Sequence, residues 1–352
     1  MIMVEKEKPN LIPFPLSYYG VPEDAVFFDI ETTGLSPYQS SLYLIGALSF
    51  TGTDGHFRQW FADSFSEELA VLRAFFSFIE RSGTLVSFNG DGFDIHYLQE
   101  CAREYAVPSN LDKKDSIDLL KISKRTRKLT NLPSYRQKAV EEYLGIRRED
   151  PYGGLELISL YESYVKAPDE ETLQTLLLHN DNDVLGLPEL LPMTFIRDLI
   201  DDPSFLETKI NEDQDSGEIR IIAGLEHAFP VPVIHCFENG NRLRIDGKSL
   251  TLAVRPFRGM LRKYYSDYRS YSFLPLEGYA VHNKLAAFVD ASRKQPCTRE
   301  NCFTTAEGVF LPLPGKEKSG AVFRSDLKSH GYYILSDVDP DAYLKAELRS
   351  LS

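Results

Sequence analysis

One short stretch, residues 26–34, places two carboxylates inside an apolar run, VFFDIETTG, which predicts a β-strand. Alternate side chains of a strand share a face, so Asp29 and Glu31 would project together while Phe28 and Ile30 pack on the other face. Two like charges this close are costly unless a cation lies between them. Magnesium and manganese ions prefer carboxylate oxygens, so the pair predicts a metal site at the end of a central strand. Two unrelated acids at a solvated strand end are the alternative.

Two further stretches carry polar residues suited to the same site. In residues 87–94, SFNGDGFD, a strand runs into a turn and Asp94 opens a helix, where the helix dipole alone also favours an acid. In residues 177–185, LLHNDNDVL, His179 and Asp183 are four residues apart, so on a helix they lie one turn apart on one face. An ordinary polar surface is the alternative, but this acidic cluster lies between two apolar runs, where it suits packing poorly.

The order of the predicted elements indicates a mixed sheet. Strands at 25–31, 41–50 and 56–61 have short connections, which predicts an antiparallel meander. The elements expected after it are a helix at 66–81, a strand at 84–88, a helix at 93–105, a strand at 116–119, a basic loop, and helices at 134–144, 155–165 and 170–200. This is the element order of an α/β fold with a ribonuclease-H-like mixed sheet flanked by helices.

A chain of 352 residues predicts two domains. Residues 1–24 are expected to be a Pro-rich lead-in that wraps the surface, and residues 25–200 to be the first domain. Residues 201–218 are rich in Asp and Glu and have little to bury, so they are expected to be an acidic linker. Residues 219–352 show short β-like runs and a helical stretch at 279–288, which predicts a smaller α+β domain of unknown role.

This C-terminal part interleaves basic and aromatic residues. Cations meet phosphates and rings stack on bases, so the pattern suits single-stranded nucleic acid, and an ordinary core with tyrosines fits it equally. The residues are Arg242, Arg244, Lys248, Arg255, Arg258, Arg262, Lys263 and Arg269, with Tyr264, Tyr265, Tyr268 and Tyr271.

The net charge of −13 and the pI of about 5.1 argue against a nonspecific nucleic-acid coat protein. The charge is unevenly distributed, because residues 119–140 hold seven basic residues and no acid. This basic tract suits contacts with phosphates, with a solvated face as the alternative.

The sequence also bears on the compartment. The N-terminal residues lack the apolar segment of a signal peptide, and no apolar run approaches the roughly 20 residues that span a bilayer, so a cytoplasmic protein is expected. The cysteines are few and lack the close pairs typical of zinc sites, which fits this compartment. They are Cys101, Cys236, Cys297 and Cys302.

Taken together, these motifs resemble the DEDD superfamily of 3′-to-5′ exonucleases on the ribonuclease-H fold, and within it the YprB-like subgroup. The resemblance covers about residues 25–200. It rests on DIETTGL at 29–35, FNGDGFD at 88–94, DLL at 118–120, LGIRREDPYGG at 144–154 and HNDNDV at 179–184.

The resemblance implies a metal-dependent 3′-to-5′ exonuclease that hydrolyses phosphodiester bonds of DNA or RNA with two magnesium or manganese ions. Asp29, Glu31, Asp94 and Asp183 would be the metal ligands, and His179 would orient or deprotonate the attacking water. His179 precedes the last aspartate by four residues, which is the spacing of the members that use Tyr at this position rather than His.

Nucleic acid, as a single strand or a 3′ end, is the expected partner, and no membrane is expected. The residues expected to contact it are Thr32, Asn89, Lys124, Arg125, Arg127 and Lys128. A catalytically silent nucleic-acid-binding or scaffold module on the same fold is the alternative, and a phosphatase of small substrates, which needs no basic tract, is a third. The presence of all four carboxylates favours an enzyme, because a retired site has no reason to keep four repelling acids together.

Overall fold

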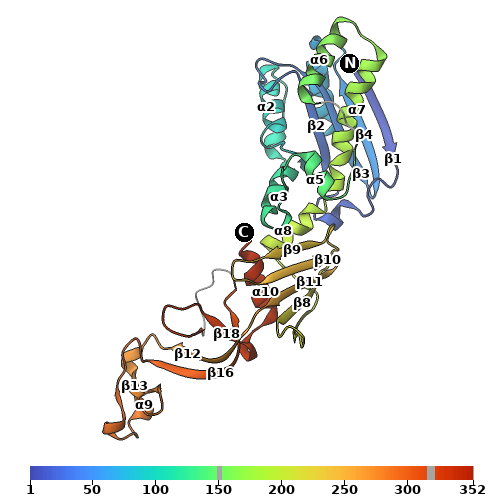
Figure 1. Ribbon diagram of the computed structural model, residues 1–352. Coiled ribbons are helices and arrows are strands. Elements are labelled where there is room, and N and C mark those ends of the chain that lie inside the picture. Colours follow the sequence, from blue (N-terminus) through green and yellow to red (C-terminus); the bar gives the residue numbers. More distant parts are fainter. Residues whose placement is uncertain (149–152, 315–321, 352) are drawn as a thin grey trace. The chain divides into compact units, whose positions relative to one another are not determined.

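The computed structural model describes residues 1–148, 153–314 and 322–351. The chain divides into two compact units, residues 1–198 and 199–352 (Figure 1). Within the described ranges, no helix is both long enough and apolar enough to cross a bilayer.

The first unit is built on a mixed sheet. Its strands are β1 (Ile2–Lys8), β2 (Val26–Thr32), β3 (Leu42–Thr51), β4 (Asp54–Phe61), β5 (Thr84–Ser87) and β6 (Asp115–Asp118), in the spatial order β1-β4-β3-β2-β5-β6. The pairs β2–β3 and β3–β4 are antiparallel, whereas β2–β5 and β5–β6 are parallel. A meander joined to parallel strands is the ribonuclease-H-like arrangement that the sequence predicts, so the predicted fold class is confirmed.

Two helices, α1 (Glu68–Phe78) and α7 (Glu170–Gly186), cover opposite faces of this sheet beside β2. The other helices between residues 94 and 201 are α2 (Asp94–Glu104), α3 (Leu119–Arg125), α4 (Arg127–Thr130), α5 (Gln137–Tyr143), α6 (Gly154–Lys166) and α8 (Met193–Asp201). Helix α1 packs on β3 and β4 and contributes Phe75, whose ring centroid lies 5.3 Å from that of Phe28 on β2. Helix α7 packs on β2 and β3. Because alternate residues of β2 face these two helices, the strand is enclosed from both sides.

The long helix predicted at 170–200 is interrupted. Asp169 caps the N-terminus of α7 by accepting a hydrogen bond from the backbone N–H of Thr172. Helix α7 then ends at Gly186, a 3₁₀ turn follows at Pro188–Leu190, and α8 begins at Met193. A proline has no N–H to donate and its ring clashes with the preceding turn, so Pro188 and Pro192 account for the break.

Residues 2–8 form the edge strand β1, antiparallel to β4, so the predicted lead-in is wrong for these residues (Figure 1). Ile2 and Val4 pack against the core from alternate positions. Lys6 continues that face and forms an ion pair with Asp181 of α7 at 3.2 Å. The charged residues made this segment look unlike a strand in the sequence. Charged residues are nevertheless common on edge strands, because they discourage pairing with other chains.

The segment predicted as a basic loop is helical, since α3 and α4 occupy residues 119–130. Asp118 caps α3, and its side chain accepts hydrogen bonds from the backbone N–H groups of Leu120 and Lys121. A capping aspartate directly before an apolar pair is a helix-start signal that the dense positive charge obscured.

The second unit consists mostly of strands. They are β7 (Thr208–Glu212), β8 (Ile219–Gly224), β9 (Val233–Cys236), β10 (Arg242–Asp246), β11 (Ser249–Val254), β12 (Phe257–Tyr264), β13 (Tyr271–Leu274), β14 (Tyr279–His282), β15 (Gln295–Pro296), β16 (Phe303–Pro312), β17 (Phe323–Arg324) and β18 (Tyr332–Ile334), with helices α9 (Asn283–Ala286) and α10 (Pro340–Arg349). One sheet has the order β7-β8-β11-β10-β9, another has the order β14-β13-β15, and β12, β16, β18 and β17 close a small barrel.

Two sequence expectations differ here. Strand β7 lies inside the predicted acidic linker 201–218 and pairs with β8, with its charged residues at the sheet edge. The predicted helix at 279–288 is instead the strand β14 followed by the single turn α9. In both places the segments are too short for periodicity to decide between strand, helix and loop.

Candidate metal centre

Strand β2 presents Asp29 and Glu31 on one face, as its alternation predicts. Phe28 and Ile30 are buried on the opposite face. Regular pairing with β3 shifts between Glu31 and Thr32, so the two carboxylates stand where the strand ends. A buried hydrophobic face thus fixes the direction of both acids.

Helix α7 lies close over this face because β3 has a glycine there. Gly46 is directly across from Asp29, and a Cβ atom at Gly46 would lie 2.1 Å from Oδ1 of Asn180 and 2.8 Å from Cγ2 of Val184. The Asn180 amide is fully buried, donating to Oδ2 of Asp29 at 3.1 Å and accepting from Nε2 of Gln59 at 3.0 Å. These bonds fix α7 over the acid pair.

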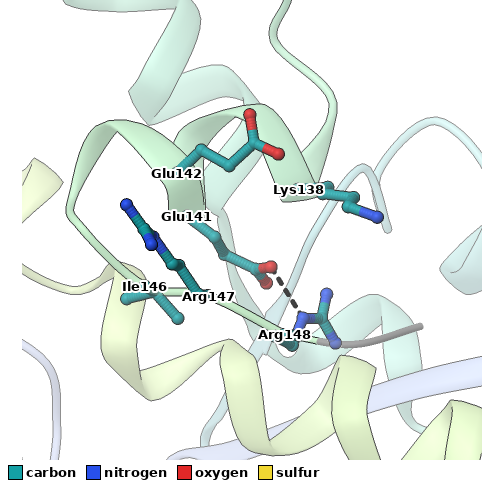
Figure 2. Close-up of a pocket in the computed structure, with 6 residues that line it drawn as sticks. All are labelled: Lys138, Glu141, Glu142, Ile146, Arg147 and Arg148. Carbon is teal, nitrogen blue, oxygen red and sulfur yellow. Dashed lines mark hydrogen bonds and ion pairs between the residues drawn. The ribbon is translucent and has the colours of Figure 1, made fainter.

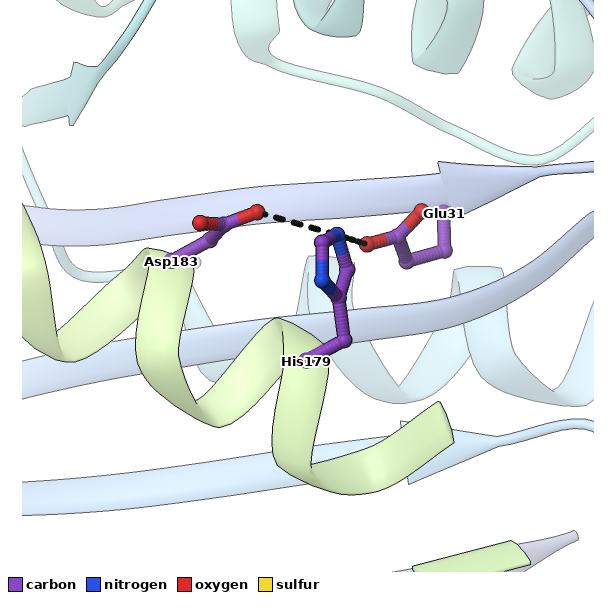
Figure 3. Close-up of side chains that lie close together, drawn as sticks. All are labelled: Glu31, His179 and Asp183. Carbon is purple, nitrogen blue, oxygen red and sulfur yellow. Dashed lines mark ion pairs between the residues drawn. The ribbon is translucent and has the colours of Figure 1, made fainter. Parts of the chain in front are cut away.

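The same helix brings His179 and Asp183 to Glu31 (Figure 3). Nε2 of His179 lies 3.4 Å from Oε1 of Glu31 and 3.2 Å from Oδ2 of Asp183. One ligand atom of each of the three residues lies within 4.8 Å of the others. Carboxylate oxygens with an imidazole nitrogen are a donor set that divalent metals accept.

Asp94, the first residue of α2, lies next to the acids of β2. Its Oδ1 accepts a hydrogen bond from the backbone N–H of Ile30 at 3.2 Å, which ties it to β2. Burial raises the pKa of Asp94 to about 7, and nearby Asp118 adds to this rise, while the bond from Ile30 opposes it. The turn before α2 contains Asn89, whose φ is 70° and whose backbone N–H donates to Asp118 at 2.9 Å.

The pKa of Asp29 is raised well above its usual range. Desolvation is the largest cause, and the carboxylates of Asp94, Glu31 and Asp183 raise this pKa further. The hydrogen bond from Asn180 opposes the shift. Four acids therefore repel one another around one point, which is the electrostatic setting that a divalent cation relieves.

Two of the four predicted ligands lie within the group of ligand atoms, and the other two lie next to it. Glu31 and Asp183 form, with His179, the group of ligand atoms within 4.8 Å, as far as the described ranges extend. Asp29 and Asp94 are not part of that group and act on it as close neighbours. The donor chemistry fits magnesium or manganese, since oxygen ligands predominate.

Arg148 was not predicted as a site residue, yet it contacts the site directly. Its Nη1 lies 2.8 Å from Oδ1 of Asp183, and its Nε lies 2.7 Å from Oε2 of Glu141 on α5. Arg148 belongs to the motif at 144–154, of which residues 149–152 lie outside the described ones. The adjacent arginines in that motif were the sequence signal that could have identified Arg148 as a site residue.

A pocket lies beside this arginine (Figure 2). Its volume is about 600 Å³, and it is lined by Lys138, Glu141, Glu142, Ile146, Arg147 and Arg148. Lys138 and Arg147 are exposed here, whereas Glu141 is buried and paired with Arg148. The pocket therefore borders the residue that contacts Asp183.

Two of the predicted nucleic-acid contacts, Thr32 and Asn89, adjoin the acids, and the four basic ones lie on other elements. Thr32 follows Glu31 at the end of β2 and donates from Oγ1 to the carbonyl of Gly34 at 2.7 Å, and Asn89 lies in the turn before Asp94. The basic residues lie on α3 and α4, and are Lys124, Arg125, Arg127 and Lys128. Another cation of the basic tract, Lys121, pairs with Asp91 at 2.6 Å and so ties α3 to the turn that leads into α2.

Comparisons with known proteins agree with this architecture. Residues 26–194 match the RNase_H superfamily. The uncharacterized protein YprB of Bacillus subtilis (strain 168) is 30% identical over 168 residues, which are 47% of this chain and 40% of YprB. The chain thus covers less than half of that relative. The family match, residues 26–194, contains the whole candidate site.

Two solved structures show more distant likeness. The family B DNA polymerase of the archaeon Pyrobaculum calidifontis is 13% identical, with a TM-score of 0.43 over 93% of this chain and 45% of that chain. Brucella melitensis NrnC bound to pGG is 21% identical, with a TM-score of 0.35 over 55% of this chain and 80% of that chain. At these TM-scores neither likeness bears on function.

Replacing Gly46 with alanine tests whether its missing side chain positions α7. We expect Gly46→Ala to lower the free energy of unfolding by about 1–3 kcal/mol, because the new methyl group meets Asn180 and Val184. It should also weaken manganese binding by moving Asp183. Chemical denaturation measures the change in stability, and calorimetric titration measures the change in manganese affinity.

Gly224→Ala on β8, where the nearest atom to a new Cβ lies 3.7 Å away, is the control. Wild-type stability and affinity in Gly46→Ala would contradict this account.

The crowded acids predict how stability depends on pH without metal. Folded Asp94 has a pKa of about 7, against about 3.9 in an unfolded chain. Between these values the folded state keeps a proton that the unfolded state has lost, so the free energy of unfolding falls as pH rises. Asp29, with a pKa raised well above its usual range, acts in the same direction.

We therefore expect chelator-treated protein to unfold at lower temperature at about pH 7 than at about pH 5. Asp29→Asn should reduce this fall and unfold at the same or a higher temperature near neutral pH, because one repelling charge is gone. Thermal melts across this pH range measure the effect, with the exposed Asp198→Asn as control. If the unfolding temperature of Asp29→Asn falls with pH as steeply as that of wild type, Asp29 does not cause the pH dependence.

Proposed function

We propose that this protein, whose residues 26–194 match the RNase_H superfamily and which is 30% identical to YprB over 168 residues, is a metal-dependent nuclease acting on DNA or RNA. The observation that carries the proposal is the convergence of Glu31, His179 and Asp183 within 4.8 Å beside the crowded Asp29. Carboxylates that can hold a cation, with an imidazole beside them, suit hydrolysis of a phosphodiester by water.

In this proposal Asp29, Glu31, Asp94 and Asp183 would hold two magnesium or manganese ions. When bound, such ions stabilise the attacking and leaving oxygens of a phosphodiester. His179 would accept the proton of the attacking water at Nε2. Since Nε2 lies 3.4 Å from Glu31 and 3.2 Å from Asp183, these carboxylates would stabilise the imidazolium that forms.

The finer features of the activity rest on the sequence motifs. The DEDD pattern supports 3′-to-5′ exonuclease action, and the basic tract supports a single strand or a 3′ end as substrate. Lys124, Arg127 and Lys128 have exposed side chains on α3 and α4, where phosphates would reach them. The cytoplasmic location stays a prediction.

A catalytically silent module on the same fold is the competing function. It would bind nucleic acid through the basic tract without using the acids of β2 and α7. The raised pKa values of Asp29 and Asp94 favour the enzyme, because binding alone gives no reason to keep these acids crowded.

The direct test uses DNA and RNA single strands labelled at the 5′ or the 3′ end, incubated with manganese, magnesium or chelator. We expect metal-dependent release of the 3′ label as a nucleotide and stepwise shortening of the 5′-labelled strand. Asp183→Asn should remove this activity. His179→Ala should lower the rate at saturating substrate by about 10²–10⁴, with manganese affinity near that of wild type.

The results separate the candidate functions. A wild-type protein that binds strands and leaves both labels intact in manganese would support the silent module. Internal cuts would keep the nuclease and refute the exonuclease polarity. If His179→Ala loses manganese affinity together with rate, His179 is a metal ligand and not the base.

A further inference from the structure

The two carboxylate oxygens of Asp183 face different partners. Oδ2 lies 3.2 Å from Nε2 of His179, which itself lies 3.4 Å from Glu31 (Figure 3). Oδ1 lies 2.8 Å from Nη1 of Arg148. One oxygen therefore points into the group of ligand atoms, and the other is occupied by a guanidinium.

Arg148 is itself held by a second acid. Its Nε lies 2.7 Å from Oε2 of Glu141 (Figure 2), and the side chains of Arg148 and Glu141 are 15% and 1% exposed. Gln137 completes the arrangement, donating from Nε2 to Oε1 of Glu141 at 2.9 Å and to the backbone carbonyl of Asp183 at 3.0 Å. The planar guanidinium thus bridges a carboxylate of α5 and a carboxylate of α7.

Gly186 leaves the space that this arrangement needs. A Cβ atom at Gly186 would lie 2.7 Å from Oε1 of Glu141, 3.2 Å from Nε2 of Gln137 and 3.6 Å from Cζ of Arg148. The fold accepts a weak helix former at the end of α7, where a side chain would displace the bridge.

We propose that Arg148, held by Glu141, is a positioning residue that fixes Oδ1 of Asp183 and thereby turns Oδ2 toward the cation. The inference rests on the proposed function in one respect, namely a divalent cation at Glu31 and Asp183. Polar partners behind metal ligands orient them, and mutating one such partner typically lowers metal affinity 10–100-fold.

The competing explanation predicts a change of opposite sign. If Arg148 only takes the place of a cation beside Asp183, it competes with the metal and repels it. Removing that positive charge would then tighten manganese binding. The direction of the change in affinity therefore separates positioning from occupancy.

The variants follow from the pairing. Arg148→Gln alone would leave the buried Glu141 without its partner, which threatens folding. The double variant Arg148→Gln/Glu141→Gln removes both charges, and Arg148→Lys keeps the positive charge but offers one ammonium in place of a planar fork. Arg147→Gln is the matched control, because this exposed neighbour lines the same pocket.

The experiment is calorimetric titration of the full chain with manganese in the absence of nucleic acid, with thermal melts in chelator to verify folding. We expect the double variant and Arg148→Lys to bind manganese about 10–100-fold more weakly, and Arg147→Gln to bind like wild type. Their cleavage rates should recover at raised manganese concentration.

Unchanged or tighter manganese binding by the double variant would overturn the inference, and so would wild-type affinity in Arg148→Lys. If the double variant does not fold, Arg148→Lys decides alone. If the wild-type protein binds manganese but cleaves no strand, the proposed nuclease activity is refuted. The role of Arg148 is then still decided by the manganese titrations of its variants. A wild-type protein that binds no manganese refutes both.

Discussion

The close packing of α7 on β3 at Gly46 is the contact on which the candidate site depends. It buries Asn180 between Asp29 and Gln59 and fixes the rotation of the helix about its axis. With that rotation fixed, His179 and Asp183, one turn apart, face Glu31. A glycine in a strand is ordinarily a weakness, and here it sets the distance between the two elements that carry the ligands.

Electrostatic repulsion is the other constraint on this centre. The pKa values of Asp29 and Asp94 are raised because burial and neighbouring acids disfavour their charged forms. The surrounding structure supports the acids at defined atoms: Ile30 donates to Asp94, Asn180 donates to Asp29, and Arg148 pairs with Asp183. The acids are thus held in place by fixed donors, an arrangement that suits a cation better than it suits stability without metal.

The sequence alone predicted the positions of those site residues whose signals lie within one short segment. The alternation around Asp29, the turn before Asp94 and the four-residue spacing of His179 and Asp183 each lie within one element, so strand and helix periods place them. The bridge of Glu141, Arg148 and Asp183 joins α5 and the segment after it to a residue of α7 more than 30 residues further along the chain, and no local period brings them together. Strand β1 and helices α3 and α4 were missed for a different reason, because dense charge masked a strand pattern and a capped helix.

The most direct test of the central claim is a crystal structure of the protein grown with manganese, with diffraction data collected at the manganese absorption edge. The account predicts an anomalous peak bound by Glu31 and Asp183, with Oδ1 of Asp183 still paired with Arg148, and a further peak near Asp29 and Asp94. An ordered site with no anomalous peak among these carboxylates would contradict it, and so would a peak held only by surface acids elsewhere.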